Sequence, residues 1–365
     1  LQSGRRLTML ARENNLDALR FWAAMAVLWS HAVPLTQGSE RNELSFRLSG
    51  GRTTTGTVAV FVFFALSGYL ITRSYERAQS PLHFVRARVL RIVPALVAVL
   101  LTTAFVIGPL VSELPLSSYL TSPEPYRYVR TQGTLFFGWA DALPGVFTDH
   151  PMPVVNGAIW TLRYEAECYG LVFLLGISGL LRKELTLALY VLVLAALAIL
   201  PGTPSVPGFP PDPNPHLDLA AGFLAGALVY QWQLRLDGRI AIGCVVATLA
   251  CLFGGQILTA QRTLIPYLAL YLALAPAVGR IYFPWRGTDV SYGLYIWAWP
   301  LSQLVVGWLR PTWWQMALVT TPLALAAAWL SWTLVEKRAL TWKDRPLFGG
   351  GPTSTPEPAA RHAHG

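Results

Sequence analysis

Long apolar runs separated by short polar segments recur along most of the chain. A run of about 20 apolar residues is long enough to cross the hydrocarbon core of a bilayer as a helix. The pattern therefore predicts an all-α polytopic membrane protein, with a helix bundle of about ten transmembrane helices. We expect a cytoplasmic N-terminal segment at residues 1–14, one membrane domain at 15–345, and a disordered cytoplasmic tail rich in Gly and Pro at 346–365. The expected spans are about 15–35, 56–72, 92–111, 157–181, 185–200, 217–233, 239–258, 263–281, 288–309 and 315–335.

Two stretches between these spans are expected not to cross the membrane. Residues 112–156 are rich in Pro, Gly and Tyr, and their one apolar piece, 134–147, is short and interrupted by Pro144 and Gly145. We interpret that piece as re-entrant or interfacial. The Pro-rich loop at 201–216 is predicted to be a stiff outer connection.

Composition and charge agree with a membrane protein. The chain is 53% hydrophobic and only 13% charged, whereas a soluble chain carries about 25% charged residues. Its net charge of +9 does not require a nucleic-acid partner, because most Lys and Arg residues fall in the segments expected on one side of the bilayer. An extra span at 134–147 would place Arg182, Lys183 and Lys337 on the opposite side. We therefore expect ten spans, both termini in the cytoplasm, and an inner (plasma) membrane location.

The first predicted span carries charges within an apolar helix. Asp17 and Arg20 lie near its start, and His31 follows Arg20 by eleven residues. Eleven residues turn a helix by about 1,100°, close to three full turns, so Arg20 and His31 share a face; Asp17 falls within about 40° of His31. Ionisable groups in a span are costly and often mark a functional interior. The alternative is that Asp17 and Arg20 are interfacial anchors and His31 only ends the helix.

The segment NGAIWTLRYEAECYG, beginning at Asn156, opens another apolar run and contains Arg163, Glu165 and Glu167. Counted from the helix ends, Glu165 and His31 lie at similar depths and could meet. A carboxylate beside an imidazole fixes its tautomer and raises its basicity. The alternative is an i,i+4 pair of Arg163 with Glu167, with Glu165 satisfied by a Tyr or a backbone donor.

Arginines and small residues complete the set of candidates. Arg86, Arg88 and Arg91 lead into the third span and are either topology anchors or a phosphate cradle, since Arg forks match phosphate geometry. Ser67 and Gly68 suit close helix packing, and no Gly-x-Ser-x-Gly elbow marks Ser67 as a nucleophile. No set of His or Cys residues has the spacing of a metal site, so we expect no metal.

Six motifs, in order, resemble the integral-membrane acyltransferase-3 family, whose members modify surface glycans and some natural products. The match runs from about residue 15 to 342. Two positions differ: Thr161 replaces the usual Ser, and Ala298 stands where relatives often have His. The six segments are LDALRFWAAMAVLWSH, FFALSGYLI, RARVLRIVPA with Arg88 and Arg91, NGAIWTLRYEAECY with Glu165, SYGLYIWAWP (291–300) and LVEKRAL (334–340).

The resemblance implies an O-acyltransferase that moves an acyl group, usually acetyl, from acyl-coenzyme A to a hydroxyl of a glycan or glycosylated small molecule. The coenzyme is a donor substrate, and no permanently bound cofactor is expected. His31 would be the general base, oriented by Glu165. The remaining assigned residues are Asp17 and Arg20 with the catalytic pair, Arg86, Arg88 and Arg91 at the donor phosphates, and Ser67, Trp160, Tyr169, Tyr292 and Trp299 in acceptor or structural roles.

A second class of function stays open at this point. A transporter or flippase of a lipid-linked glycan would also place charges inside the membrane. That class gives no reason for the His and the Arg cluster, and the chain has no clear internal repeat. The sequence does not separate direct transfer from a covalent acyl-enzyme.

Overall fold

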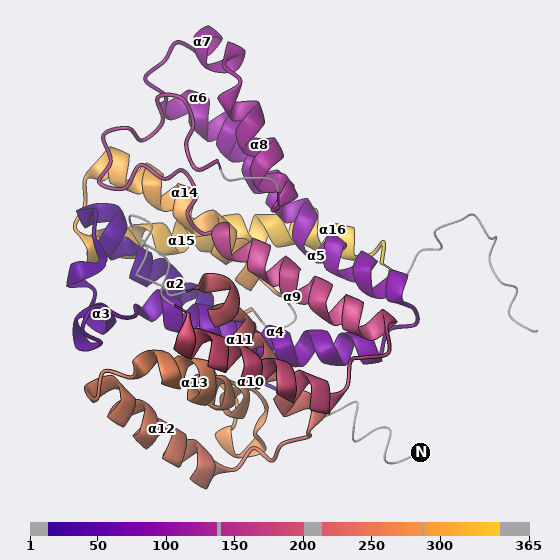
Figure 1. The fold of residues 1–365 in the computed structure, drawn as a ribbon. Helices are drawn as coiled ribbons and strands as arrows, with labels where there is room; N and C mark the ends of the chain where they lie inside the picture. Colours follow the sequence, from indigo (N-terminus) through magenta and orange to yellow (C-terminus); the bar gives the residue numbers. More distant parts are fainter. Residues whose placement is uncertain (1–13, 137–139, 201–213, 286–287, 344–365) are drawn as a thin grey trace, which may run out of the picture.

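The computed structural model describes residues 14–136, 140–200, 214–285 and 288–343, and within these ranges its regular elements are all helices (Figure 1). Every apolar run predicted to span the membrane coincides with a helix. These helices are α2 (Leu16–Gln37), α4 (Thr55–Glu76), α5 (Pro81–Thr102), α9 (Trp160–Ile177), α10 (Lys183–Ile199), α11 (Pro215–Gln231), α12 (Gly238–Phe253), α13 (Ile257–Leu274), α14 (Ser291–Leu309) and α15 (Trp313–Ser331).

Two of these helices continue through a π-helical turn. The helix α5 passes through η2 (Thr103–Ile107) into α6 (Gly108–Val111), and α15 passes through η4 (Trp332–Glu336) into α16 (Lys337–Leu340). Shorter helices occupy the connections. They are η1 (Glu40–Asn42), α3 (Leu44–Leu48), α7 (Leu116–Thr121), α8 (Glu124–Thr134) and η3 (Pro276–Val278).

Five helices of the described part are long and apolar enough to cross a membrane: 16–37, 55–76, 81–111, 257–274 and 313–340. The all-helical membrane class is thus confirmed, while the count of ten spans stays a prediction. Residues 1–13 of the expected N-terminal segment, the tail from 346 and most of the Pro-rich loop at 201–216 lie outside the described residues.

The third predicted span begins earlier than expected. We predicted a helix from about residue 92, whereas α5 begins at Pro81. The Ser80 side chain accepts a hydrogen bond from the His83 backbone N–H, and Pro81 occupies the first turn, where its missing N–H costs nothing. Arg86, Arg88 and Arg91 therefore lie on a rigid helix, with Arg88 and Arg91 three residues apart on neighbouring positions of one side.

The region 112–156 is more ordered than predicted. It includes α7 and α8, which bury Tyr119 and Tyr128 against the bundle (Figure 1). Beyond Thr134 the described part of 134–147 contains no helix. Its apolar side chains enter the core, and Ser112 Oγ donates a hydrogen bond of 2.7 Å to the Pro144 carbonyl. Burial of single aromatic residues, which shows no regular period in the sequence, explains why these elements were missed.

The helix α4 packs against α2, α11 and α13, and its contact with α11 is very close (Figure 1). A Cβ atom added at Gly68 would lie 1.9 Å from the Phe223 carbonyl oxygen, and one added at Gly226 would lie 2.0 Å from the Ala65 carbonyl oxygen. Small residues let the two backbones approach this far. The prediction that Gly68 serves close helix packing is confirmed.

Gly68→Ala should therefore destabilise the bundle by about 1–3 kcal/mol, the usual cost of overpacking a tight contact. The expected result is a lower thermal unfolding midpoint of the purified protein in detergent. Gly243→Ala is the matched control, because an added Cβ there would meet no atom within 4 Å. Equal midpoints for the two variants would contradict the packing role of Gly68.

Candidate active site

A cavity of ≈ 460 Å³ lies among α4, α5, α9 and α14. Its mouth is lined by the basic residues Arg77, His83 and Lys343, and Arg77 and Lys343 are exposed. Its far end is lined by Val60 and Phe63 of α4, Thr161 of α9 and Tyr295 of α14. On α4 alone the lining runs from Val60 to Arg77, which is roughly 26 Å at the rise of a helix. The cavity is therefore deep and narrow.

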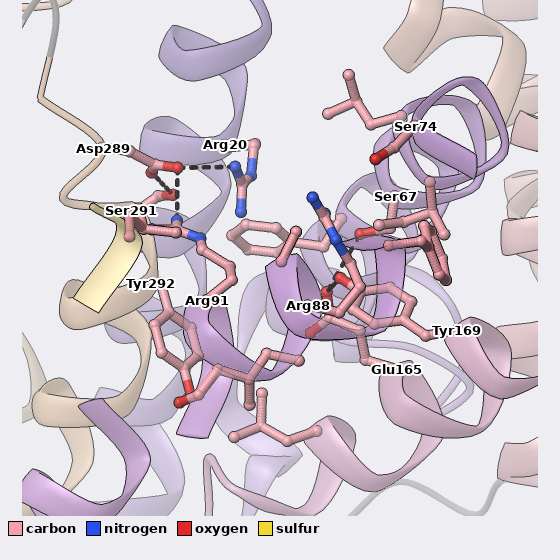
Figure 2. Close-up of a pocket in the computed structure, with 18 of the residues that line it drawn as sticks. Arg20, Ser67, Ser74, Arg88, Arg91, Glu165, Tyr169, Asp289, Ser291 and Tyr292 are labelled. Carbon is pink, nitrogen blue, oxygen red and sulfur yellow. Dashed lines mark hydrogen bonds and ion pairs between the residues drawn. The ribbon is translucent and has the colours of Figure 1, made fainter. Parts of the chain in front are cut away.

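Charged and polar groups surround the middle of the cavity (Figure 2). Glu165 accepts hydrogen bonds from Ser67 Oγ, at 3.3 Å, and from the Tyr169 hydroxyl. Figure 2 shows the Arg88 side chain beside this group. The Arg88 Nε is buried without a hydrogen-bond partner, and no described carboxylate forms an ion pair with its guanidinium. Arg88 thus lies at the cavity near Glu165 without a direct ion pair to any carboxylate of the described residues.

The neighbouring arginines are neutralised by carboxylates. Asp289 receives Arg20 Nη1 at 2.9 Å and also the Arg91 guanidinium (Figure 2). Arg91 Nη1 lies 3.1 Å from Glu336 Oε2, and the Glu336 side chain is only 1% exposed. Ser291 donates to Asp289 at 2.6 Å. Two cations and two anions therefore form one compact network beside the cavity.

The structure brings together only part of the predicted site. Seven predicted residues line the cavity: Arg20, Ser67, Arg88, Arg91, Glu165, Tyr169 and Tyr292. Tyr292 donates a hydrogen bond of 2.9 Å to the Ile92 carbonyl, and its ring lies 5.6 Å from the Arg91 guanidinium carbon. The other five, Asp17, His31, Arg86, Trp160 and Trp299, are not among the lining residues, and Asp17 is exposed.

His31 lies beyond the far end of the cavity. Its ring packs edge-on against the buried Trp299, with the ring centroids 4.7 Å apart. The indole N–H of Trp299 donates to the Val154 carbonyl at 2.8 Å, which fixes the ring. Trp299 follows Tyr295 by four residues, or about one turn of α14, so His31 is about one turn beyond the Tyr295 side chain.

The expected direct contact between His31 and Glu165 is absent among the hydrogen bonds and ion pairs of the described residues. Antiparallel packing of α2 and α4 explains this. Gly56 lies against Ser30, so Ser67, eleven residues further along α4, is level with the start of α2 near Arg20. Glu165 contacts Ser67 and therefore lies about 16 Å along the bundle from His31. Counting from helix ends placed Glu165 too close to His31.

The alternative arrangement of the α9 charges is the one observed. Arg163 Nε donates to Glu167 Oε1 at 2.9 Å with i,i+4 spacing, and Glu165 is bound by Tyr169 one turn away. Glu167 also lies 2.8 Å from the His216 Nδ1.

Sequence reasoning missed Asp289, Glu336, Thr161 and Tyr295 as members of the site. Asp289 lies two residues before Ser291, the first residue of the segment SYGLYIWAWP, and Glu336 lies within LVEKRAL. For Asp289 and Glu336, the available signal in the sequence was a carboxylate at the edge of an apolar segment. The partner of Asp289 could not be deduced from the sequence, because Arg91 and Asp289 are 198 positions apart.

Arg91→Ala should destabilise the protein by about 3–5 kcal/mol, because it leaves buried negative charge without its partner. Thermal unfolding in detergent measures this loss. Arg163→Ala is the control, since its exposed i,i+4 pair is worth only about 0.3–0.5 kcal/mol. Adding Glu336→Gln to Arg91→Ala should restore part of the stability. No restoration would show that Glu336 is not held by Arg91.

Comparisons with known proteins identify one family and two similar proteins. Residues 13–336 match the model of the acyltransferase-3 family, described as an acyltransferase domain. The chain is 29% identical over 338 residues to "O-acetyl transferase" of Shigella phage Sf6, covering 90% of this chain and 97% of the relative. It is 28% identical over 361 residues to "Nodulation protein 10" of Rhizobium leguminosarum bv. viciae, covering 90% and 93%.

No solved structure matches the chain. The family model covers nearly all of the helices that build the cavity, from the start of α2 to Glu336 in the ion-pair network. The two relatives also align along nearly their full lengths. The chain therefore belongs to the acyltransferase-3 family and is a membrane acyltransferase.

Proposed function

We propose that this acyltransferase moves an acyl group, most simply acetyl, from acyl-coenzyme A to a hydroxyl of a carbohydrate or glycosylated acceptor. The order of polarity along the cavity carries this proposal. Basic residues line the mouth, charged and polar residues line the middle, and mostly apolar and aromatic residues, with the Thr161 hydroxyl bonded to Tyr295, line the far end. An acyl-coenzyme A has the same order: a phosphate-bearing head, an amide-containing arm and an apolar acyl tip.

Three helices give this order independently. Going from the middle of the cavity to its far end, the lining residue changes from Ser67 to Phe63 on α4 and from Glu165 to Thr161 on α9. On α14 it changes from Ser291 to Tyr295. Each step is four residues, or about 6 Å. Polarity thus decreases at one level of the bundle, where the two remaining hydroxyls, of Thr161 and Tyr295, bond to each other, and this supports a ligand with a less polar end.

Basic side chains would bind the donor at two levels. At the mouth, Arg77 and Lys343, together with the His83 ring, suit the phosphates of the nucleotide head, and Arg88 suits a phosphate or a carbonyl of the arm. Arg91 was predicted to share this role, but its guanidinium is committed to Asp289 and Glu336. We therefore assign Arg91 to holding the network and Arg88 to binding the donor. A volume of ≈ 460 Å³ is within the usual range of ligand cavities.

His31 would act as the general base at the far end. An acceptor hydroxyl that approaches from the His31 side would lose its proton to the imidazole as its oxygen attacks the thioester carbon. The bond from that carbon to sulfur then breaks, and coenzyme A leaves as a thiolate that is protonated. We write the reaction as direct transfer, because the lining serines Ser67 and Ser291, whose hydroxyls donate to Glu165 and Asp289, lie at the middle of the cavity, about one turn from its far end near His31.

Two further features of the proposal rest on the family and on charge. The name of the Sf6 phage relative supports an oxygen acceptor and an acetyl group. The excess of basic residues in the segments expected on one side supports a plasma-membrane protein with both termini in the cytoplasm. Donor and acceptor would then approach from opposite sides of the membrane.

Purified protein in lipid nanodiscs, given acetyl-coenzyme A with a labelled acetyl group and a panel of glycans, tests the proposal. We expect release of free coenzyme A coupled to labelled O-acetyl product. Mass spectrometry of surface glycans and secreted metabolites from a deletion strain identifies the natural acceptor. Movement of a lipid-linked glycan between leaflets with no release of coenzyme A would replace the proposal with a flippase.

A further inference from the structure

The far end of the cavity is closed by three side chains from three helices. The Thr161 hydroxyl lies 2.7 Å from the Tyr295 hydroxyl, and the Phe63 ring stands edge-on to the Tyr295 ring with centroids 5.8 Å apart. Thr161 and Tyr295 are buried. The hydrogen bond and the ring contact position the Tyr295 side chain, so these three side chains form a wall that limits the space at the far end, and the acceptor hydroxyl has to reach the thioester carbon past them.

This wall lies next to where the transfer must occur. Trp299, one turn beyond Tyr295 on α14, contacts His31. A thioester carbonyl that meets a hydroxyl near His31 therefore has to sit close to Tyr295. The carbon chain attached to that carbonyl must fit into the space between Ser67 and the wall. Along α4 this space is about one helical turn long, from Ser67 to Phe63.

We propose that Tyr295, held by Thr161 and packed against Phe63, limits the acyl group to a short chain. This inference rests on the proposed function and names its donor class as short-chain acyl thioesters. A bulky ring at the base of a cavity excludes longer chains sterically, because packed interiors leave no space for added methylene groups. Removal of either ring should create that space.

Rates of transfer from acetyl-, propionyl-, butyryl- and hexanoyl-coenzyme A test the proposal. For the unaltered protein we expect kcat/KM to fall steeply beyond propionyl. Phe63→Ala and Tyr295→Leu should raise the ratio of hexanoyl to acetyl kcat/KM at least tenfold. Tyr295→Phe, which keeps the ring and loses only the bond to Thr161, should raise it less.

Leu70→Ala is the matched control, because it also enlarges the cavity on α4 but nearer the mouth. Its hexanoyl to acetyl ratio should equal that of the unaltered protein. An unaltered protein that uses hexanoyl- and acetyl-coenzyme A equally well would overturn the inference while leaving the acyltransfer reaction in place. The inference would also be overturned if Phe63→Ala and Tyr295→Leu retain acetyl transfer and leave the ratio of hexanoyl to acetyl kcat/KM unchanged. No turnover of any acyl-coenzyme A would instead remove the proposed function and this inference together.

Discussion

His31→Ala should slow acyl transfer by about 10²–10⁴-fold, the usual contribution of a general base. His31→Gln should be similarly slow, because an amide cannot take up the hydroxyl proton. The KM for acyl-coenzyme A should change little, since His31 lies beyond the lining of the donor cavity. The measurement is steady-state transfer by purified variants in lipid, with folding checked by thermal unfolding.

His216→Gln is the control for His31→Gln. It makes the same change at a histidine that is half exposed and bound to Glu167, and it should leave the rate unchanged. A kcat near that of the unaltered protein in His31→Ala would remove the imidazole from the mechanism.

Combining His31→Gln with Glu165→Gln separates two arrangements of the site. A direct His–Glu pair would give non-additive losses, as partners acting as one unit do. In this structure Glu165 is bound by Ser67 and Tyr169 and has no bond to His31. We therefore expect the two losses to multiply. A double variant no slower than His31→Gln alone would show that the residues meet during turnover.

Arg88→Ala should raise the KM for acyl-coenzyme A by about 10- to 100-fold. A hydrogen bond to a charged group contributes about 1.5–3 kcal/mol, and each 1.4 kcal/mol is a factor of ten. Arg88→Lys should recover little of the affinity, because an ammonium lacks the bidentate fork. Substrate titrations measured by release of coenzyme A give both values.

Arg86→Ala is the control for Arg88→Ala. It removes an equal charge from the same helix at a position outside the cavity lining, so it should change the donor KM little. If Arg86→Ala and Arg88→Ala raise KM equally, general attraction of the phosphates to a basic surface explains binding better than contact with Arg88.

The sequence allowed the class of fold and much of the cavity to be predicted, because both depend on local patterns. Apolar runs located the helices, charged residues inside those runs identified Arg20 and Glu165, and the basic segment before the third run identified Arg88. The relative depth of helices was not predictable in the same way. A few residues of error at a helix end shift a side chain by several ångströms, and the position of Ser67 beside Glu165 depends on how α4 packs against α2 and α9.

The distinction between Arg88 and Arg91 also required the structure. In the sequence they are equivalent positions of one motif, three residues apart. They differ because Asp289 and Glu336, from distant parts of the chain, both reach Arg91. Only the folded arrangement shows which of the two arginines forms direct ion pairs.

The wall formed by Phe63, Thr161 and Tyr295 also bears on the electrical insulation of the membrane. A water-filled passage from Arg77 to His31 would let protons run down the transmembrane potential, which drives each charge with about 2.3 kcal/mol per 100 mV. In the described part of the chain, the polar path from the mouth ends at aromatic side chains before it reaches His31. Under the proposed reaction a small neutral acyl group would cross this level while charges are kept out. A variant with a shortened side chain at this wall should therefore make energised vesicles leak protons, which a pH-sensitive dye inside the vesicles would report.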